Sequence, residues 1–462
     1  MSYEILDNNK IFIVQRSEIK GRLDPKMALY NRKVLHSLYP KVRLKDVLLC
    51  KPQYGASESG IPRRFMEEPR YIRITDIDEN GLISYNELGA TAKMIEDKYI
   101  LGENDLLIAR SGATVGKAYI HKHVPYECFF AGYLIRFIID TDKALPEYIF
   151  TYTQLNAYKE WVNAIQRPSG QPNINSEEYQ SIEIPLPNIE RQQVIVDVIK
   201  SAYLQKKQKE SEAQQLLDNV DAYILNELGI TLPEIKTDLK NRIFKVNRSE
   251  LEERLDPTVY KDGIKLISNN YDNVKLSSVA YVNPTGTFKG KDIETPISFI
   301  PMESIDEIYS EVSKLEDTTI ENASGFTKFK EGDLLWAKIT PCMQNGKSAI
   351  AKNLTNGLGC GSTEFFVMRN KDERLAIEYL HVILHMKCVR ETAMLYFGGS
   401  AGQQRVSSAF LENFNLPLPP KEKQIEKANH VYTIRQKAKA LQEEGKVLLE
   451  EAKRKVESMI IG

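Results

Sequence analysis

Apolar residues near the C-terminal end of the chain recur at alternating steps of three and four residues. They lie at positions Val431, Ile434, Ala438, Leu441, Gly445, Leu448 and Ala452. This spacing is typical of the buried seam of a coiled coil, because it keeps one face of a helix apolar over many turns. The same seam occurs 232 residues earlier, interrupted by Lys206 and Lys209. The pattern therefore predicts two long helices, over residues 188–228 and about 421–460.

Shorter apolar runs in the middle of each half predict β-strands. Residues 105–110 (DLLIAR) and 133–139 (YLIRFII) are two such runs, and each lies between turn-forming residues. A Pro-Leu-Pro segment, at residues 185–187 and again at 417–419, closes each of these regions, because proline cannot continue a helix and favours extended backbone before it. Each half is thus expected to hold a strand-rich domain followed by one long helix.

The chain repeats itself at an offset of 232 residues. Residues 11–25 (IFIVQRSEIKGRLDP) and 243–257 (IFKVNRSELEERLDP) are identical at ten of fifteen positions. Both segments end in an Asp-Pro pair, which predicts an N-cap followed by proline at the first helical position. The offset slips by a few residues in the middle of each half and returns to 232 at the Pro-Leu-Pro segments. The duplication therefore spans the whole chain, with middles that match poorly.

An internal duplication packs most simply about a pseudo-two-fold axis, which makes the two long helices antiparallel. We therefore expect an α+β fold with two pseudo-symmetric domains, at residues 1–187 and 231–420. Two long helices, at residues 188–230 and 421–462, separate these domains and pair as an antiparallel coiled coil. The alternative is two separate helices that each belong to the core of one half.

The composition fits a globular protein and excludes two broad classes. The 62 basic and 63 acidic residues leave a net charge of -1, so the chain is not a uniformly basic DNA-binding protein, although a local basic face suffices for DNA. No apolar run is long enough to span a membrane, and the N-terminus lacks the pattern of a signal peptide. The five cysteines are odd in number and never spaced C-x-x-C. A cytoplasmic location is therefore expected.

Several short motifs occur in a fixed order in the first half. Residues 111–117 (SGATVGK) and 169–174 (SGQPNI) precede the Pro-Leu-Pro segment, and residues 190–195 (ERQQVI) follow it on the long helix. In this arrangement and its duplication, the chain resembles the specificity subunit of type I restriction–modification systems over essentially all of its length. The second half departs from the pattern at residues 339–347 (ITPCMQNGK) and 399–404 (GSAGQQ).

The resemblance implies a division of labour. The domains at residues 1–187 and 231–420 would be target-recognition domains, each reading one part of a split, asymmetric site in double-stranded DNA. The two helices would fix the spacer and dock two DNA-adenine methyltransferase (modification) subunits, and motor–nuclease (restriction) subunits join in systems that cleave DNA. A specificity subunit of a nuclease-free methyltransferase and a protein-interaction scaffold that binds no DNA are the alternatives.

The sequence contains no recognisable catalytic motif. An adenine methyltransferase needs an Asn/Asp-Pro-Pro-aromatic motif, and residues 418–421 (LPPK) do not match it. No Walker A loop for phosphate occurs. His381 and His385 are four residues apart on one expected helix face, but the glutamate of a zinc-protease motif is missing between them. We therefore expect no enzyme activity, no cofactor and no metal.

Basic and amide side chains, with a few serine and threonine residues, in the loops of the poorly matching middles are the candidate DNA contacts. Arginine suits bidentate contacts with guanine or phosphate, and asparagine and glutamine suit adenine, whereas glycine allows close approach of the backbone to phosphate. Solvated strand edges, tight turns and contacts with the methyltransferase subunits are the alternative roles. The candidates in the first half are Arg63, Arg64, Arg70, Arg73, Arg110, Ser111, Lys117, Gln166, Arg167, Ser169, Gln171 and Asn173. Those in the second half are Lys289, Lys291, Lys338, Thr340, Gln344, Asn345, Lys347, Gln403, Gln404 and Arg405.

Overall fold

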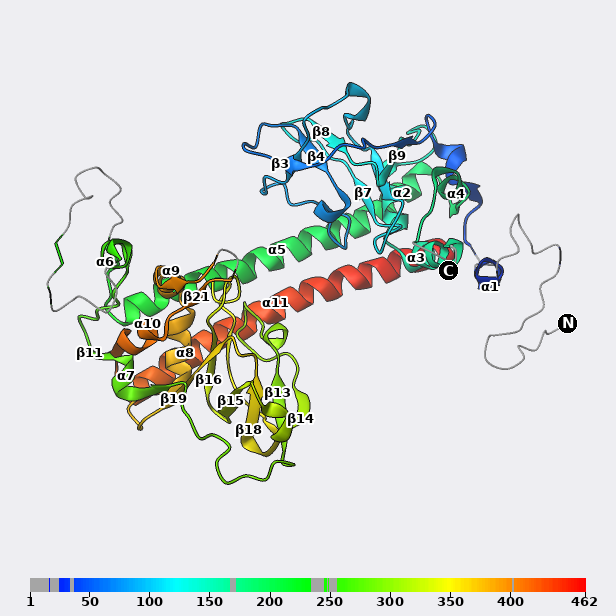
Figure 1. Ribbon diagram of the computed structural model, residues 1–462. Coiled ribbons are helices and arrows are strands. Elements are labelled where there is room, and N and C mark those ends of the chain that lie inside the picture. Colours follow the sequence, from blue (N-terminus) through cyan, green and yellow to red (C-terminus); the bar gives the residue numbers. More distant parts are fainter. Residues whose placement is uncertain are drawn as a thin grey trace. The chain divides into compact units, whose positions relative to one another are not determined.

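The computed structural model (Figure 1) contains two compact units. The first consists of residues 1–208 and 444–462, and the second of residues 209–443. The structure describes residues 16, 25–33, 37–166, 172–233, 245–246, 248, 256–400 and 403–462. Two long helices, α5 (Ile189–Glu227) and α11 (Lys421–Ile461), contribute a stretch to each unit.

Each unit also holds a strand-rich domain. In the first unit its elements are α1 (Pro25–Lys33), β1 (Lys41–Arg43), β2 (Gln53–Tyr54), β3 (Ile61–Pro62), β4 (Arg70–Ile72), β5 (Ala90–Thr91), β6 (Leu106–Ala109), β7 (Ala118–Ile120), β8 (Cys128–Phe130), β9 (Leu134–Phe137), α2 (Pro146–Thr153), α3 (Asn156–Ile165), α4 (Ser176–Gln180) and β10 (Glu183–Pro185). In the second unit they are α6 (Pro257–Asp262), β11 (Asp272–Lys275), α7 (Leu276–Val279), β12 (Ala280–Val282), β13 (Pro296–Ile300), β14 (Glu316–Thr319), β15 (Thr327–Lys330), β16 (Leu334–Ala337), β17 (Ser348–Ile350), β18 (Leu358–Gly361), β19 (Phe365–Asn370), α8 (Ile377–His385), α9 (Lys387–Met394), β20 (Phe397–Gly398), β21 (Arg405–Val406), α10 (Ser408–Asn413) and β22 (Asn415–Leu418).

Each domain contains two four-stranded sheets; the first sheet corresponds strand for strand, whereas the second differs in one edge strand, β3 beside β5 in the first unit and β15 beside β18 in the second. One sheet has the order β2-β9-β6-β7 in the first unit and β12-β19-β16-β17 in the second. The other has the orders β3-β5-β4-β8 and β14-β13-β18-β15, with one parallel pair in each, β4 with β8 and β13 with β18. The strands predicted at residues 105–110 and 133–139 are confirmed as β6 and β9, which pair with each other. The duplication in the sequence is therefore a duplication of the fold.

Strand β6 shows why these strands appear as continuous apolar runs. Alternate residues of a strand point to opposite faces of its sheet. Leu106 and Ile108 pack with residues of α2 and α3, whereas Leu107 and Ala109 pack with residues of β4 and β8 from the second sheet. Because both faces are covered, the strand needs apolar residues at every position.

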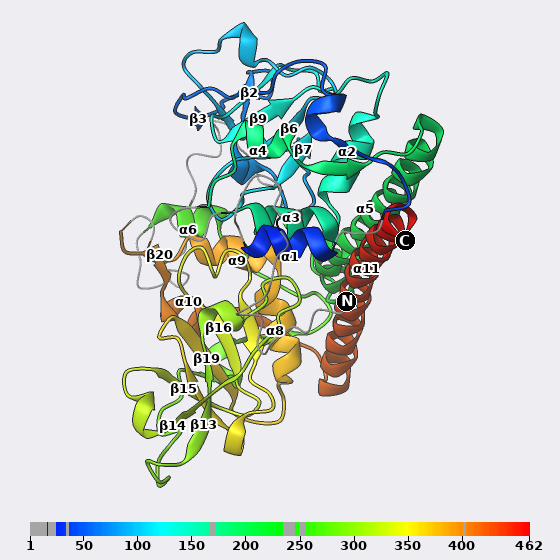
Figure 2. The same ribbon diagram turned by 90° about the vertical axis from the view of Figure 1, so that its right-hand side faces the viewer.

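The two long helices pair in an antiparallel coiled coil, as predicted (Figures 1 and 2). In the first unit, Ile199 near the start of α5 shares a core with Ala452 near the end of α11. In the second unit, Val220 near the end of α5 shares a core with Val431 near the start of α11. In each unit the start of one helix therefore lies beside the end of the other, so the helices run in opposite directions.

Small residues let the helices approach each other closely in the middle of the seam. Ala213 and Ala438 are fully buried in one cluster. A Cβ atom on Gly445 would lie 3.2 Å from Cγ of Lys206. Lys206 therefore occupies a seam position, as the spacing of apolar residues predicted. The aliphatic part of its side chain packs against α11 at Gly445.

The Pro-Leu-Pro segment of each half, together with one glutamine near the start of each long helix, fastens each domain to the helix that follows it. Gln192 and Gln424 are fully buried, and the side-chain oxygen of each accepts a hydrogen bond of 2.8 Å from the backbone N–H at the start of α2 or α8. Each amide also donates to the carbonyl of the last proline of the motif, at 2.8 Å. The hydroxyls of Tyr148 and Tyr379 donate to the carbonyl of the first proline. These buried bonds hold strand, domain helix and long helix together.

A carboxylate from the far end of the other long helix completes each attachment. Glu457 of α11 accepts from the backbone N–H of Ala157, at the start of α3, at 2.8 Å. Asp221 of α5 accepts from the backbone N–H of Lys387, at the start of α9, at 2.7 Å. An acid at a helix N-terminus satisfies an otherwise unpaired donor. Each domain is therefore held by both long helices.

The predicted Asp-Pro helix starts lie partly within the described residues. The Asp256 side chain accepts a hydrogen bond of 3.0 Å from the N–H of Thr258, and Pro257 is the first residue of α6. This N-cap is therefore confirmed. In the first half, α1 begins at Pro25, whereas Asp24 lies outside the described residues.

Candidate nucleic-acid interface

Two candidate segments of the first domain lie side by side. The loop at residues 110–117 pairs with the segment before α4 through an antiparallel bridge between Ser111 and Asn173. The N–H of Gly112 donates to the Pro172 carbonyl at 3.0 Å. The structure therefore brings together Arg110, Ser111 and Asn173, which are far apart in the sequence.

The second domain brings the corresponding segments together in the same way. Ile339 and Arg405 form an antiparallel bridge. The N–H of Thr340 donates to the Gln404 carbonyl at 3.0 Å, and the Lys338 carbonyl accepts at 2.9 Å from the residue after Arg405. We call these regions the paired loops: residues 110–117 with 172–174, and residues 338–347 with 403–406.

The side chains on this shared backbone differ between the domains. In the first domain, the Arg110 guanidinium lies over the Tyr54 ring, 4.9 Å from its centroid. The backbone N–H of Arg110 donates to the carbonyl of Tyr133, whose side chain is 66% exposed. Neither tyrosine is among the candidates predicted from the sequence, which are basic, amide, serine and threonine residues.

In the second domain, the backbone N–H of Lys338 donates to the carbonyl of Glu364, at the position that Tyr133 occupies in the first. The Glu364 carboxylate pairs with Arg405, with Nε to Oε2 at 2.9 Å and Nη2 to Oε1 at 2.7 Å. These hydrogen bonds hold the pKa of the Glu364 carboxyl below its ordinary value. Glu364 is a further residue that the sequence analysis missed, and only its pairing with Arg405 reveals it.

Two candidate lysines bind within their own domains. Lys117 Nζ donates to the Ile77 carbonyl at 2.6 Å, and Lys347 Nζ donates to the Met302 carbonyl at 3.2 Å. The glycines before them have φ angles of +87° and +89°, and a Cβ atom there would lie within 3.0 Å of a neighbouring side chain. The tight-turn interpretation therefore applies to both loops.

The loop positions of the second domain are also held internally. The Gln344 carbonyl accepts from Nη1 of Arg390, and its side chain accepts from the Thr340 hydroxyl. Asn345 donates to Glu307 at 3.2 Å. These contacts fix the shape of the loop and leave Lys338 and Arg405 nearest to the bridge.

The arginine-rich stretch at residues 63–73 requires a correction, because it does not form one surface. Arg63 and Arg70 are 3% and 1% exposed. Arg63 donates to the carbonyls of Leu88 and Met66 and lies over the Tyr126 ring, and Arg70 donates to the Ser84 carbonyl at 2.8 Å. Both side chains are therefore part of the interior.

The remaining candidates are spread over the two domains. Arg64, Asn173, Lys289, Lys291 and Gln403 are exposed, and Gln166 and Gln404 are half-buried. The half-exposed Arg73 pairs with Asp76 at 2.8 Å. Arg167, Ser169 and Gln171 lie outside the described residues.

His381 is buried and His385 is half-buried, and each ring has a hydrogen-bond partner within the second domain. His381 Nε2 lies 3.0 Å from the Ser348 hydroxyl, and His385 Nε2 lies 3.2 Å from the Glu307 carbonyl. Burial lowers the pKa of His381 to about 3 and that of His385 well below its ordinary value. In the described part of the chain, no group of three or more His, Cys, Asp and Glu side chains is placed to hold a metal ion.

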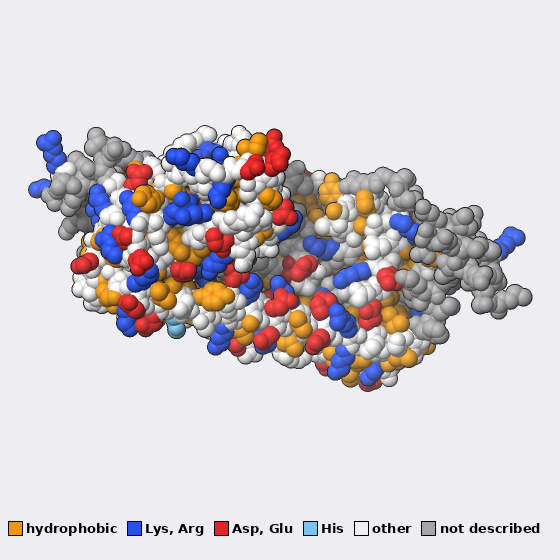
Figure 3. Space-filling view, turned by 90° about the horizontal axis from the view of Figure 1, so that it is seen from below, with side chains coloured by type: hydrophobic (Ala, Val, Ile, Leu, Met, Phe, Trp, Pro, Cys, Tyr) orange, Lys and Arg blue, Asp and Glu red, His pale blue; other side chains and the backbone are white. Residues whose placement is uncertain are grey.

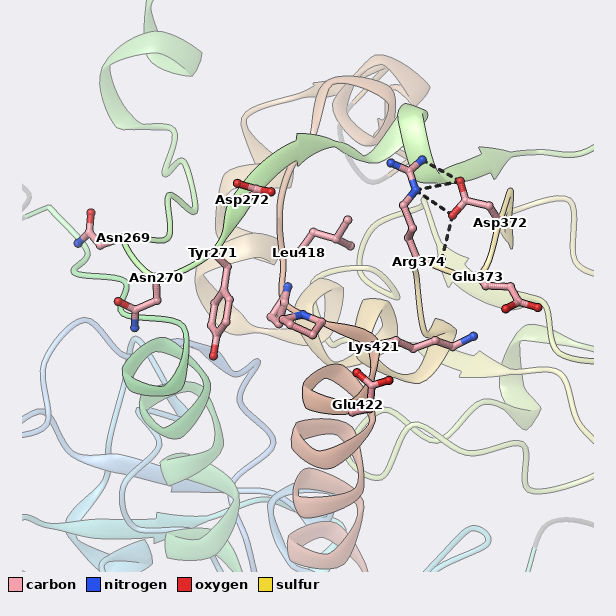
Figure 4. Close-up of a pocket in the computed structure, with 12 residues that line it drawn as sticks. Asn269, Asn270, Tyr271, Asp272, Asp372, Glu373, Arg374, Leu418, Lys421 and Glu422 are labelled. Carbon is pink, nitrogen blue, oxygen red and sulfur yellow. Dashed lines mark hydrogen bonds and ion pairs between the residues drawn. The ribbon is translucent and has the colours of Figure 1, made fainter.

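A shallow hollow of about 1000 Å³ lies at the start of α11 (Figure 4). Its lining contains no serine, threonine, cysteine or histidine, and Arg374 in it pairs with Asp372 at 2.7 Å. No described helix is both long and apolar enough to cross a membrane.

The surface is not uniformly basic. Figure 3 shows basic and acidic side chains interspersed over the face drawn. On this face, a surface that binds anions can therefore arise only from local clusters of basic side chains.

The fold and the paired loops define a duplicated chain in which two similar domains present different side chains on one backbone frame. The family described as the type I restriction modification DNA specificity domain matches residues 41–218 and 268–448. These matches cover well over half of the chain, and the chain belongs to this family.

Two curated relatives and one solved structure show the extent of the similarity. The EcoEI type I restriction enzyme specificity subunit of Escherichia coli is 34% identical over 165 residues, which cover 34% of this chain and 26% of the relative. The EcoAI specificity subunit of the same species is 34% identical over 180 residues, which cover 38% and 28%. The match thus spans about a quarter of the length of these relatives. A chain from a structural study of the assembly and conformational transition of a type I restriction–modification system has the same fold, with 16% identity, a TM-score of 0.50 and coverage of 91% and 96%.

Proposed function

We propose that this chain is the DNA sequence-specificity subunit of a type I restriction–modification complex, and that each half reads one part of a split, asymmetric DNA site. The observation that carries this proposal is the paired-loop frame, which is built twice from distant segments and carries different side chains each time. A shared frame gives both domains the same approach to DNA, and different side chains give them different base preferences.

The proposed domains keep the boundaries inferred from the repeat. Residues 1–187 and 231–420 are the two target-recognition domains, and residues 188–230 and 421–462 are the helices between them. Base contacts come from the paired loops, through Arg110, Ser111, Asn173, Lys338, Gln404 and Arg405. Phosphate contacts come from the exposed Arg64, Lys289 and Lys291.

The buried and internally bonded candidates take a different role in this proposal. Arg63 and Arg70 stabilise the first domain, and Lys117 and Lys347 hold the loops in shape. Gln344 and Asn345 belong to the same group, because their partners are residues of their own domain.

The long helices are the proposed docking surface for two DNA-adenine methyltransferase subunits. Large apolar side chains remain exposed on their outer faces, among them Val194, Leu204 and Val447 in the first unit and Tyr432 in the second. Exposed apolar side chains on a paired helix fit a surface that a partner covers. Motor–nuclease subunits join where the system also cleaves DNA, and the chain itself carries out no covalent step. All five cysteines are free, which fits a reducing cytoplasm.

DNA binding by the complex with its modification subunits tests the proposal. The complex should bind a duplex with both half-sites tighter than one with either half scrambled, and the affinity should fall steeply with salt. Equal binding to all three duplexes would favour a protein-interaction scaffold instead.

A further inference from the structure

One arginine of the second domain is held in a fixed orientation at the paired loops. The Glu364 carboxylate accepts hydrogen bonds from Nε–H and from one Nη2–H of Arg405. The Gln403 carbonyl accepts a third hydrogen bond, from Nη1 of Arg405, at 3.0 Å. A guanidinium has five N–H groups. Among the described residues, these partners use three of them and leave one on each terminal nitrogen.

Resting on the proposed function, we propose that Arg405, oriented by Glu364, reads a guanine in the half-site of the second domain. The two remaining N–H groups match the O6 and N7 acceptors of guanine in the major groove, which arginine binds in a bidentate manner. The Arg405 side chain is 44% exposed, so a base edge can reach it, whereas the Glu364 side chain beneath it is 21% exposed. Because Glu364 already restricts the rotamers of Arg405, less conformational entropy is lost on binding.

The first domain lacks this arrangement at the same backbone positions. Asn173 bridges Ser111 where Arg405 bridges Ile339, and Tyr133 stands where Glu364 stands. A tyrosine does not orient a guanidinium as a carboxylate does. Among the residues that the structure describes, the oriented-arginine contact therefore belongs to the second half-site.

The chain offers a matched control. Arg374 makes the same side-on pair with Asp372, with Nε to Oδ1 at 3.1 Å and Nη2 to Oδ2 at 2.7 Å, and its side chain is 57% exposed. It lies at the hollow beside the start of α11 and not at the paired loops (Figure 4). Replacement of Arg374 by glutamine therefore removes one positive charge and one side-on ion pair from the second domain, as replacement of Arg405 does.

The experiment uses the full chain in complex with its modification subunits. Rates of adenine methylation are measured on duplexes in which each position of the split site is varied in turn, for the wild type and for R405Q, E364Q and R374Q. Wild type should require a G·C pair in the half-site that the second domain reads. R405Q should reduce discrimination at that pair by roughly 5- to 150-fold and leave the other half-site unchanged. E364Q should weaken discrimination at the same pair by less, and R374Q should match the wild type.

The outcomes separate this inference from the proposed function. A wild-type complex that methylates no split site would overturn both. A normal wild-type pattern that R405Q leaves unchanged would overturn the inference alone, as would a second half-site without a G·C pair. An equal loss in R405Q and R374Q would show that only charge matters and would also overturn it.

Discussion

Single buried side chains account for the short motifs that recur in the two halves. Gln192 bonds both to the domain before it and to the proline before its helix, with both partners at 2.8 Å. Replacement by leucine preserves its size but leaves a buried N–H and a buried carbonyl unpaired. We expect Q192L to lower the free energy of unfolding by about 1–3 kcal/mol in urea denaturation.

The neighbouring glutamine is the control for this prediction. Gln193 is exposed, and its side-chain amide donates to Asp197, one turn along the same helix. Q193L should change the free energy of unfolding little. Equal destabilisation by Q192L and Q193L would show that the buried amide does not fasten the domain.

The buried histidine His381 predicts a pH dependence of stability. Burial lowers its pKa from 6.5 to about 3, so the folded state keeps it neutral while the unfolded state binds a proton below about pH 6.5. Its contribution to stability is complete above about pH 6.5 and is lost as the pH falls toward 3. H381Q should therefore flatten this part of the acid unfolding curve. The exposed His430 serves as a control, and an unchanged slope in H381Q would contradict the prediction.

Residue-level prediction from sequence failed where a polar side chain folds back into its own domain. Arg63 and Arg70 belong to an arginine-rich stretch that was predicted to contact DNA. Their guanidinium groups instead donate hydrogen bonds to backbone carbonyls in the interior. Such partners lie 14 and 25 residues away in the chain, and no local pattern indicates them. Glu364 was missed for the same reason, because its partner Arg405 lies 41 residues away.

Among the elements, the coiled coil depends on a close approach at one glycine. Gly445 faces Lys206, and a Cβ atom there would already meet the lysine stem at 3.2 Å. G445L inserts a whole side chain at this point, and we expect it to lower the free energy of unfolding by about 1–3 kcal/mol. Thermal or urea unfolding measures this effect.

A second variant identifies the cause of that effect. K206A removes the lysine stem that the new leucine would meet, so the double variant K206A/G445L should recover part of the lost stability. Strictly additive losses would mean that the two residues do not meet across the seam.

The elements differed in how far the sequence determined them. The helices follow from a seam of regular period between residues 431 and 452 and its counterpart 232 residues earlier, and the Asp256 N-cap follows from its Asp-Pro pair. The pairing of β4 with β8 and of the two paired loops joins segments about sixty residues apart. Periodicity gives the face of a strand but not its partner, so neither pairing could be predicted.

For the whole molecule, the duplication predicts that each domain determines specificity for its own half of the split DNA site, independently of the other domain. Deletion of the second domain with retention of both long helices should abolish specificity for one half of the split site and keep it for the other. Methylation patterns of the complex measure this. Continued methylation of the undivided original site would contradict the model of one domain for each half-site.

The central claim is that this chain selects the DNA sequence for a methyltransferase complex. The most direct test is a genome-wide map of methylated adenines in the source strain, with and without the gene for this chain. The account predicts that methylation disappears at one split, asymmetric sequence when the gene is removed. An identical map in both strains, in cells that express the chain and its modification subunits, would contradict it.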